Sequence, residues 1–164
     1  MNSENWRIAG DGVELAVYRW GNPKGIPLLL VHSYPDNHHI WLPLIEQLAG
    51  EFQLFAYDVR GCGHSASPAR LRDYQLPHLS RDLQAVIRAV SPDRPVHLLV
   101  PSADRFVNPR LFDDLTQWVP NLQRREVAAG HWQLRAEPLQ LAAWVREFIV
   151  QQEARRQPSE QSAA

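Results

Sequence analysis

One short apolar stretch that ends in a carboxylate constrains the fold more than any other part of the chain. Residues 96–100 read Val-His-Leu-Leu-Val, lie between Pro95 and Pro101, and continue into Ser102-Ala103-Asp104. A run this short and bounded by prolines predicts a buried strand rather than a helix. Parallel sheets carry reactive groups at the carboxyl ends of their strands. The sequence therefore predicts Asp104 at such an edge.

A second short strand leads into a histidine. Residues 125–128 read Arg-Glu-Val-Ala and are followed by Ala129-Gly130-His131-Trp132. An acid after one strand and a histidine after the next can orient each other, as the acid and the base of a hydrolytic triad do. We therefore expect Asp104 and His131 to form a dyad within hydrogen-bond reach. The alternative is an aspartate that caps a turn or helix and a histidine held by local hydrogen bonds.

Strands and helices alternate along the rest of the chain. Residues 6–20 predict a hairpin around Asp11-Gly12, and the apolar run at 28–31 predicts a strand buried on both faces. The pattern further predicts a strand at 52–57, an exposed loop at 66–74 and helices at 39–48, 77–90, 108–118 and around residues 141–148. We expect one α/β domain over residues 1–150, with a mostly parallel sheet of about six strands and helices on both faces. Residues 151–164 are polar and predict a disordered tail or a linker stub.

Composition excludes several classes of protein. The chain has 164 residues and a formal net charge of -1, so no basic surface for nucleic acid is indicated. No apolar run approaches the ~20 residues that span a bilayer, and the first residues do not resemble a signal segment. A single cysteine, Cys62, excludes an internal disulfide framework. These features predict a cytoplasmic domain that binds neither nucleic acid nor a membrane.

Four motifs follow one another along the chain: Leu-Leu-Leu-Val-His-Ser-Tyr-Pro-Asp-Asn (28–37), Tyr-Asp-Val-Arg-Gly-Cys-Gly-His-Ser (57–65), Pro-Ser-Ala-Asp-Arg-Phe-Val (101–107) and Ala-Gly-His-Trp (129–132). Together and in this order they resemble an α/β-hydrolase, and most closely the epoxide-hydrolase and haloalkane-dehalogenase branch. The resemblance covers about residues 6–150 and implies a hydrolase of small esters, epoxides or halides. It also implies that His131 is the catalytic base, that Asp104 fixes its tautomer, and that Asp58 is a structural residue that bonds backbone groups.

The resemblance breaks at the nucleophile. In that family the strand that corresponds to residues 96–100 lies beside the strand that corresponds to residues 28–31. It leads into the nucleophile elbow, a tight turn with the pattern small-x-nucleophile-x-small. Here the same run leads directly into the segment that resembles the later, acid-bearing strand end. The elbow, its helix, the next strand and the lid are absent from the sequence, as an in-frame deletion between two similar strands would leave it. We therefore expect weak or no activity, with a non-catalytic scaffold or binding module of the same fold as the alternative.

The resemblance assigns expectations to a few further residues. His32 and Ser33 stand where the family has the His-Gly loop whose backbone helps to form an oxyanion hole, and Ser33 departs from the glycine. Ser102 is the candidate substitute nucleophile, although Val100 and Asp104 flank it where small residues belong. The pocket candidates are Tyr34, Trp41 and Trp132, and core packing is the alternative for the first two.

No metal or cofactor is predicted. His38 and His39 are adjacent, so we expect their side chains to point apart, and no matching cysteine or acid cluster accompanies them. The expected partner is a small-molecule substrate. Apolar surface bared by the missing elements predicts self-association as well, and a third interpretation takes the polar tail as the stub of a fused partner domain.

Overall fold

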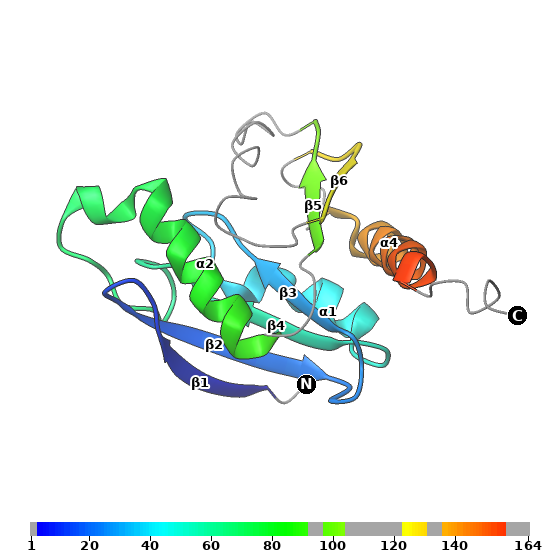
Figure 1. Cartoon of the computed structure of the whole chain (residues 1–164), viewed down its shortest axis with the longest axis horizontal. Helices are drawn as coiled ribbons and strands as arrows, with labels where there is room; N and C mark the ends of the chain where they lie inside the picture. The colour runs from blue at the N-terminus through cyan, green and yellow to red at the C-terminus, as the bar shows by residue number, and fades with distance from the viewer. Residues whose placement is uncertain (1–2, 92–96, 104–122, 131–135, 157–164) are drawn as a thin grey trace, which may run out of the picture.

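The computed structural model describes residues 3–91, 97–103, 123–130 and 136–156. Its main sheet has four strands in the order β1-β2-β4-β3 (Figure 1). β1 pairs antiparallel with β2, β2 pairs antiparallel with β4, and β3 pairs parallel with β4. The strands are β1 (Glu4–Ala9), β2 (Glu14–Gly21), β3 (Pro27–Val31) and β4 (Gln53–Tyr57).

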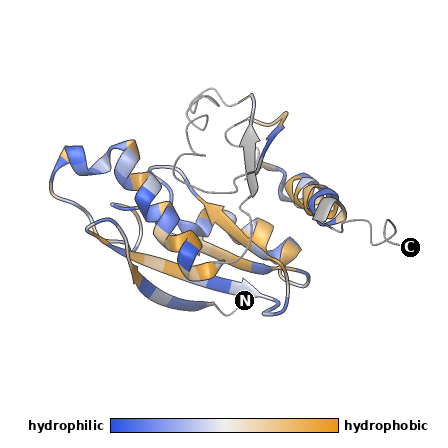
Figure 2. Cartoon of the chain, in the orientation of Figure 1, coloured by the Kyte–Doolittle hydropathy of each residue, from blue (hydrophilic) through white to orange (hydrophobic). Residues whose placement is uncertain are grey.

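The predicted hairpin is confirmed as β1 and β2. Gly12 adopts a φ of 73°, a conformation that glycine reaches without steric cost. β2 lies between β1 and β4 in the sheet and is buried on both faces because helices pack against each side. β3 is an almost continuous hydrophobic strand (Figure 2), but it is an edge strand in which only Leu30 is buried and Val31 is exposed, so the prediction of a strand buried on both faces is wrong.

Helices cover both faces of this sheet, as predicted. The alternation of side chains along β2 sends Ala16, Tyr18 and Trp20 toward one face and Leu15 and Val17 toward the other. The first face packs against α1 (Leu42–Leu48), the 3-10 turn η1 (His38–Trp41) that precedes it, and α4 (Pro138–Arg156). The second packs against α2 (Leu76–Val90). The two clusters together form the core, and the α/β class is confirmed.

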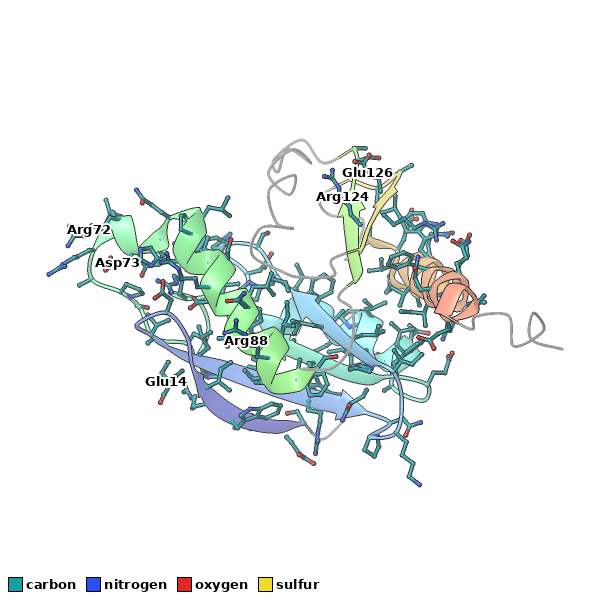
Figure 3. All side chains as sticks on the ribbon, in the orientation of Figure 1. Glu14, Arg72, Asp73, Arg88, Arg124 and Glu126 are labelled. Carbon is teal, nitrogen blue, oxygen red and sulfur yellow. The ribbon has the colours of Figure 1, made fainter. Side chains whose placement is uncertain are left out.

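The structure changes the expectation for residues 66–74 and does not test the one for residues 108–118. The loop predicted at 66–74 contains a 3-10 turn, η2 (Leu71–Tyr74), whose Arg72 and Asp73 are visible at the far end of α2 (Figure 3). The helix predicted at 108–118 lies outside the described residues.

The strand at 96–100 does not lie beside β3, so that prediction is wrong. It forms β5 (His97–Pro101), which pairs in parallel with β6 (Gln123–Val127) as a separate two-stranded sheet. Among the described strands, β3 pairs with β4 alone. The expected single, mostly parallel sheet is therefore a mixed four-stranded sheet plus this pair. The prediction took its strand order from the family that the sequence resembles, and an apolar strand does not by itself specify its neighbour.

α4 extends further than predicted. It continues to Arg156, so residues 151–156 are helical and do not belong to a disordered tail. Gln151 donates to the Glu147 side chain one turn earlier (2.9 Å), and Gln152 is buried. Polar composition misled the prediction because Gln, Glu, Ala and Arg are all good helix formers. Residues 157–164 lie outside the described residues.

Ion pairs join α4 to its neighbours. Arg146 contacts Glu51 with two nitrogens (2.6 and 2.9 Å) and donates to the Gln47 carbonyl at 2.8 Å. Arg125 of β6 reaches Glu147 of α4 at 3.3 Å, while Arg124 and Glu126 form an ion pair of their own along β6 (2.7 Å; Figure 3). Within the described residues, no helix combines the length and apolar character needed to cross a membrane.

Candidate functional site

Buried polar groups gather where β3 and β4 end. Val31 is the last residue of β3 and Tyr57 is the last of β4, and the two are partners in the parallel register. The next residue in each case is polar and buried, namely His32 and Asp58. His32 Nε2 lies 3.9 Å from Asp58 Oδ1, and neither side chain is exposed. This is the edge at which α/β sheets place their reactive groups.

Asp58 has all of its carboxylate lone pairs in use. Oδ1 accepts from the backbone N–H of His38 and lies 2.8 Å from His38 Nδ1, and Oδ2 accepts from Tyr18 Oη (3.1 Å) and from the backbone N–H of His64 (2.9 Å). Burial opposes ionisation of Asp58, but the bonds from the His64 and His38 backbone and from the His38 ring outweigh it and hold its pKa below the ordinary value. Asp58 is therefore a charged anchor that binds backbone groups, as predicted.

Gly63 makes room for this anchor. It has a φ of 49°, and a Cβ at this position would collide with Asp58 Oδ2. A glycine is therefore required twice over, by backbone conformation and by the close approach of a carboxylate.

His32 ties the loop after β3 to the loop after β4. Its Nε2 accepts the backbone N–H of Val59 at 2.9 Å, so the ring proton must be on Nδ1, which lies 3.0 Å from the Ser33 carbonyl. Burial lowers the pKa of His32, more than the Ser33 carbonyl and Asp58 raise it. His32 is thus a neutral ring of one tautomer that holds the backbone at Ser33.

A chain of hydrogen bonds leads from Asp58 to solvent. Tyr18 Oη lies 2.8 Å from His64 Nδ1 and donates to Asp58. Because a phenol donates one proton, His64 Nδ1–H must be the donor to Tyr18. The His64 side chain is 68% exposed. Burial, reinforced by the charge on Asp58, raises the pKa of Tyr18 to about 12, which keeps it a neutral phenol.

A second buried pair supports the turn after β4. Arg60 Nε and Nη2 bind the two carboxylate oxygens of Asp82 on α2 at 2.7 and 2.8 Å, and Nη1 donates to the Asp73 carbonyl at 2.6 Å. Asp82 also accepts the backbone N–H of Asp11 in the hairpin turn (2.8 Å). The bidentate pair thereby joins the β1–β2 hairpin, the β4 turn and α2.

The structure describes some of the predicted site residues and not others. Asp104, His131 and Trp132 lie outside the described residues, so the dyad stays a prediction. Ser102 is exposed and follows β5, where both its N–H (2.8 Å) and its Oγ (3.0 Å) donate to the Val127 carbonyl.

The remaining predicted residues lie in the segment that joins β3 to α1. Ser33 is half-buried beside His32, and Tyr34 is 76% exposed. Trp41 packs in the core, which agrees with the alternative stated for it, and its Nε1 has no hydrogen-bond partner in the described part of the chain.

Sequence reasoning missed the partners of Asp58. Tyr18, His38 and His64 lie 40, 20 and 6 residues away from it, and no local pattern links them. The rings of His38 and His39 were expected to point apart but lie 4.0 Å apart between centroids. The 3-10 turn that carries both residues brings the rings together. Across the described residues, no group of three or more histidine, cysteine or acidic side chains has a metal-binding arrangement.

Comparison with known proteins agrees with the fold. The family model described as "alpha/beta hydrolase fold" matches residues 26–103. "Probable oxidoreductase EphD" of Mycobacterium tuberculosis is 44% identical over 89 residues, which cover 54% of this chain and 15% of that protein. "Epoxide hydrolase 3" of Xenopus tropicalis is 31% identical over 88 residues, 54% of this chain and 24% of that protein. The crystal structure of epoxide hydrolase VrEH1 from Vigna radiata superimposes with a TM-score of 0.54 at 25% identity, covering 60% of this chain and 32% of that one.

The fold and these matches place the chain in the α/β-hydrolase superfamily. Its relatives identify the epoxide hydrolase-like branch within it. The chain spans about a quarter or less of the length of these two curated relatives.

Proposed function

We propose that this chain is a hydrolase-like domain with weak or no activity toward small esters, epoxides or halides. The observation that carries the proposal is the pairing of β5 and the segment that follows it. This strand pairs with β6 and runs into Ser102, whose hydroxyl donates to the Val127 carbonyl. In the described part of the chain, no nucleophile-bearing turn therefore stands beside His32 and Ser33.

The proposal includes loss of the elbow and the lid around residues 95–104. The match to the family model ends at residue 103, which supports this junction. With no elbow, the Asp104–His131 dyad would activate water directly, with the backbone at Ser33 as the oxyanion donor. A general base alone contributes roughly 10²–10⁴-fold, far less than a complete triad in a closed site.

A non-catalytic binding module of the same fold is the second candidate. The engagement of the Ser102 hydroxyl with a backbone carbonyl favours it, because that hydroxyl is not presented to a base. Under either candidate we place the protein in the cytoplasm, with a small molecule as ligand. Self-association would use exposed apolar side chains such as Leu71 and Tyr34.

Turnover by the purified chain tests the proposal. We expect slow hydrolysis at most of an aryl epoxide and of a small alkyl halide, abolished by His131→Ala and nearly unchanged by Ser102→Ala. If Ser102→Ala instead removes activity at unchanged stability and the parent accumulates a covalent alkyl adduct on Ser102, Ser102 is the nucleophile and the proposal is wrong. Rapid turnover that survives both substitutions would also contradict it.

A further inference from the structure

His38 and Asp58 form an imidazole–carboxylate pair that the proposed dyad does not use. His38 Nδ1 lies 2.8 Å from Asp58 Oδ1, and the carboxylate is fully buried. An ionised carboxylate is only an acceptor, so Nδ1 must carry the ring proton and donate it. The lone pair of His38 is therefore on Nε2, the nitrogen on the opposite edge of the ring. The orientation is that of a catalytic histidine backed by an acid.

Neighbouring rings clamp the imidazole on its faces. Tyr18 stacks on one side with centroids 3.6 Å apart and planes 17° apart, and the His39 ring lies 4.0 Å away. These neighbours contact the faces of the imidazole, whereas the Nε2 lone pair lies in the ring plane. Nε2 makes no hydrogen bond within the described residues, and 7% of the His38 side chain reaches solvent.

The supporting carboxylate is itself fixed. Tyr18 Oη and the backbone N–H of His64 hold its second oxygen, so Asp58 cannot rotate away from His38 without breaking both bonds. A base whose own partner is held by a further layer of hydrogen bonds retains one orientation and one tautomer. That is the property that distinguishes a reactive histidine from one that is merely exposed.

We propose that His38 is a second reactive site, a nucleophile toward activated acyl groups such as aryl esters, with Asp58 as its positioning residue. The site lies on η1 and at the end of β4, and uses neither Asp104 nor His131. It is independent of the proposed hydrolase dyad.

The reaction balances with water as the only other reactant. The Nε2 lone pair forms a bond to the ester carbonyl carbon, and the bond from that carbon to the aryl oxygen breaks to release the aryloxide. The acyl-imidazolium keeps its Nδ1–H on the Asp58 carboxylate, which stabilises the positive charge. Water then attacks the acyl carbon and gives one proton to solvent, the N–C bond breaks with its electron pair returning to Nε2, and the carboxylic acid leaves while the neutral His38 ring is restored.

The protonation state of His38 suits this role. Burial lowers its pKa, and this effect exceeds the upward pull of the hydrogen bond and charge of Asp58. The rings of His39 and His64 face it as well, and their charged forms lower the same pKa. His38 is therefore unprotonated at neutral pH, as a nucleophile must be.

Aryl ester turnover by the full chain tests the site, with release of p-nitrophenolate from p-nitrophenyl acetate as the signal. We expect His38→Gln to lower the rate by about tenfold or more, while His78→Gln on α2, at the opposite face of the sheet, serves as the control and stays near the parent rate. The Gln amide can still donate to Asp58, and circular dichroism melting checks that the variant is folded. His131→Ala should leave this ester activity in place, which separates the site from the proposed dyad.

Acid quenching during turnover identifies the attacked atom. Peptide mapping by mass spectrometry should find the acetyl group on His38, and this measurement on the parent protein needs no variant to fold. In Asp58→Asn the midpoint of the rate against pH should move downward, because the carboxylate that raises the His38 pKa is gone; loss of structure alone would lower the rate without moving the midpoint. Unchanged turnover by folded His38→Gln, absence of turnover by the parent, or acetyl on another residue such as Lys24 or Cys62 would each overturn the proposal.

Discussion

Asp58 binds His38 twice, through the backbone N–H and through the ring Nδ1, with both nitrogens 2.8 Å from one carboxylate oxygen. The two contacts fasten the turn before α1 to the end of β4, which are 20 residues apart in the chain. The same carboxylate holds the turn at His64 through its other oxygen. One buried charge therefore organises the loops at the carboxyl edge of the sheet, and the stability of the domain should depend on it.

Replacing Asp58 should destabilise the domain strongly. Asp58→Ala leaves two buried N–H groups and the Tyr18 hydroxyl without their acceptor, and unmade bonds of this kind cost about 1–3 kcal/mol each. We expect the free energy of unfolding, measured in urea, to fall by about 3 kcal/mol or more. Glu46→Ala on the exposed side of α1 is the control and should change it by less than about 0.5 kcal/mol. Equal effects of the two substitutions would show that Asp58 is not the anchor.

Three glycines should respond to alanine in a fixed order. Gly63 has a positive φ and lies against Asp58, Gly12 has a positive φ in open space, and Gly50 has open space with no such φ. Thermal unfolding should show a larger loss of stability for Gly63→Ala than for Gly12→Ala, because alanine is strained at a positive φ and at Gly63 would also collide with Asp58. Gly50→Ala should be neutral or slightly stabilising, because alanine lowers the conformational entropy of the unfolded chain. A Gly63→Ala variant as stable as Gly12→Ala would contradict the close approach to Asp58.

Breaking the Arg60–Asp82 pair should cost more than breaking an exposed pair. Arg60→Met leaves the Asp82 carboxylate buried without its bidentate partner, and such losses are about 3–5 kcal/mol. Arg146→Met removes a pair with Glu51 whose side chains are 39% and 53% exposed, so a loss below about 1 kcal/mol is expected.

The double substitution Arg60→Met/Asp82→Leu should recover part of the first loss, since it removes the stranded charge. A double-mutant cycle in urea measures this coupling. Strict additivity of the two single substitutions would show that Arg60 and Asp82 do not act as a pair.

Stability should decrease as the pH falls below about 6.5, the ordinary pKa of histidine. Burial lowers the pKa of His32 in the folded state, so the unfolded chain binds its proton first and gains free energy from doing so. The stability is complete above the unfolded pKa and is lost as the pH falls through the folded one. Protonation would also break the bond from the Val59 N–H to Nε2.

Melting temperatures between pH 8 and pH 5 measure this effect. His32→Gln should flatten the dependence in that window, whereas Gly50→Ala, which changes no titratable group, should leave the slope of the parent. His38 adds to the slope in the same direction, because burial lowers its pKa too. A parent protein whose stability rises on acidification would contradict the assignment of neutral, buried rings.

The sequence determined the local elements and their faces. The Asp11-Gly12 turn, the continuous apolar run of β3 and the helical spacing of α2 each depend on interactions within a few residues, and all were predicted correctly. The role of Asp58 was also predicted, because residues 57–65 resemble a turn of α/β-hydrolases in which the aspartate is structural, and its bond from the His64 N–H agrees with that role.

Only the tertiary structure decided which strands pair and which side chains meet at Asp58. The pairing of β5 with β6 rather than β3 results from competition between strand edges, and the apolar sequence of β5 suits either neighbour. The assembly of Tyr18, His38 and His64 around Asp58 joins segments up to 40 residues apart. Such contacts depend on how the strands and turns stack in space, and no periodicity in the chain encodes which distant side chain arrives there. Interactions between residues close in the chain therefore determined the strands, helices and turns, and packing between distant segments determined the site around Asp58.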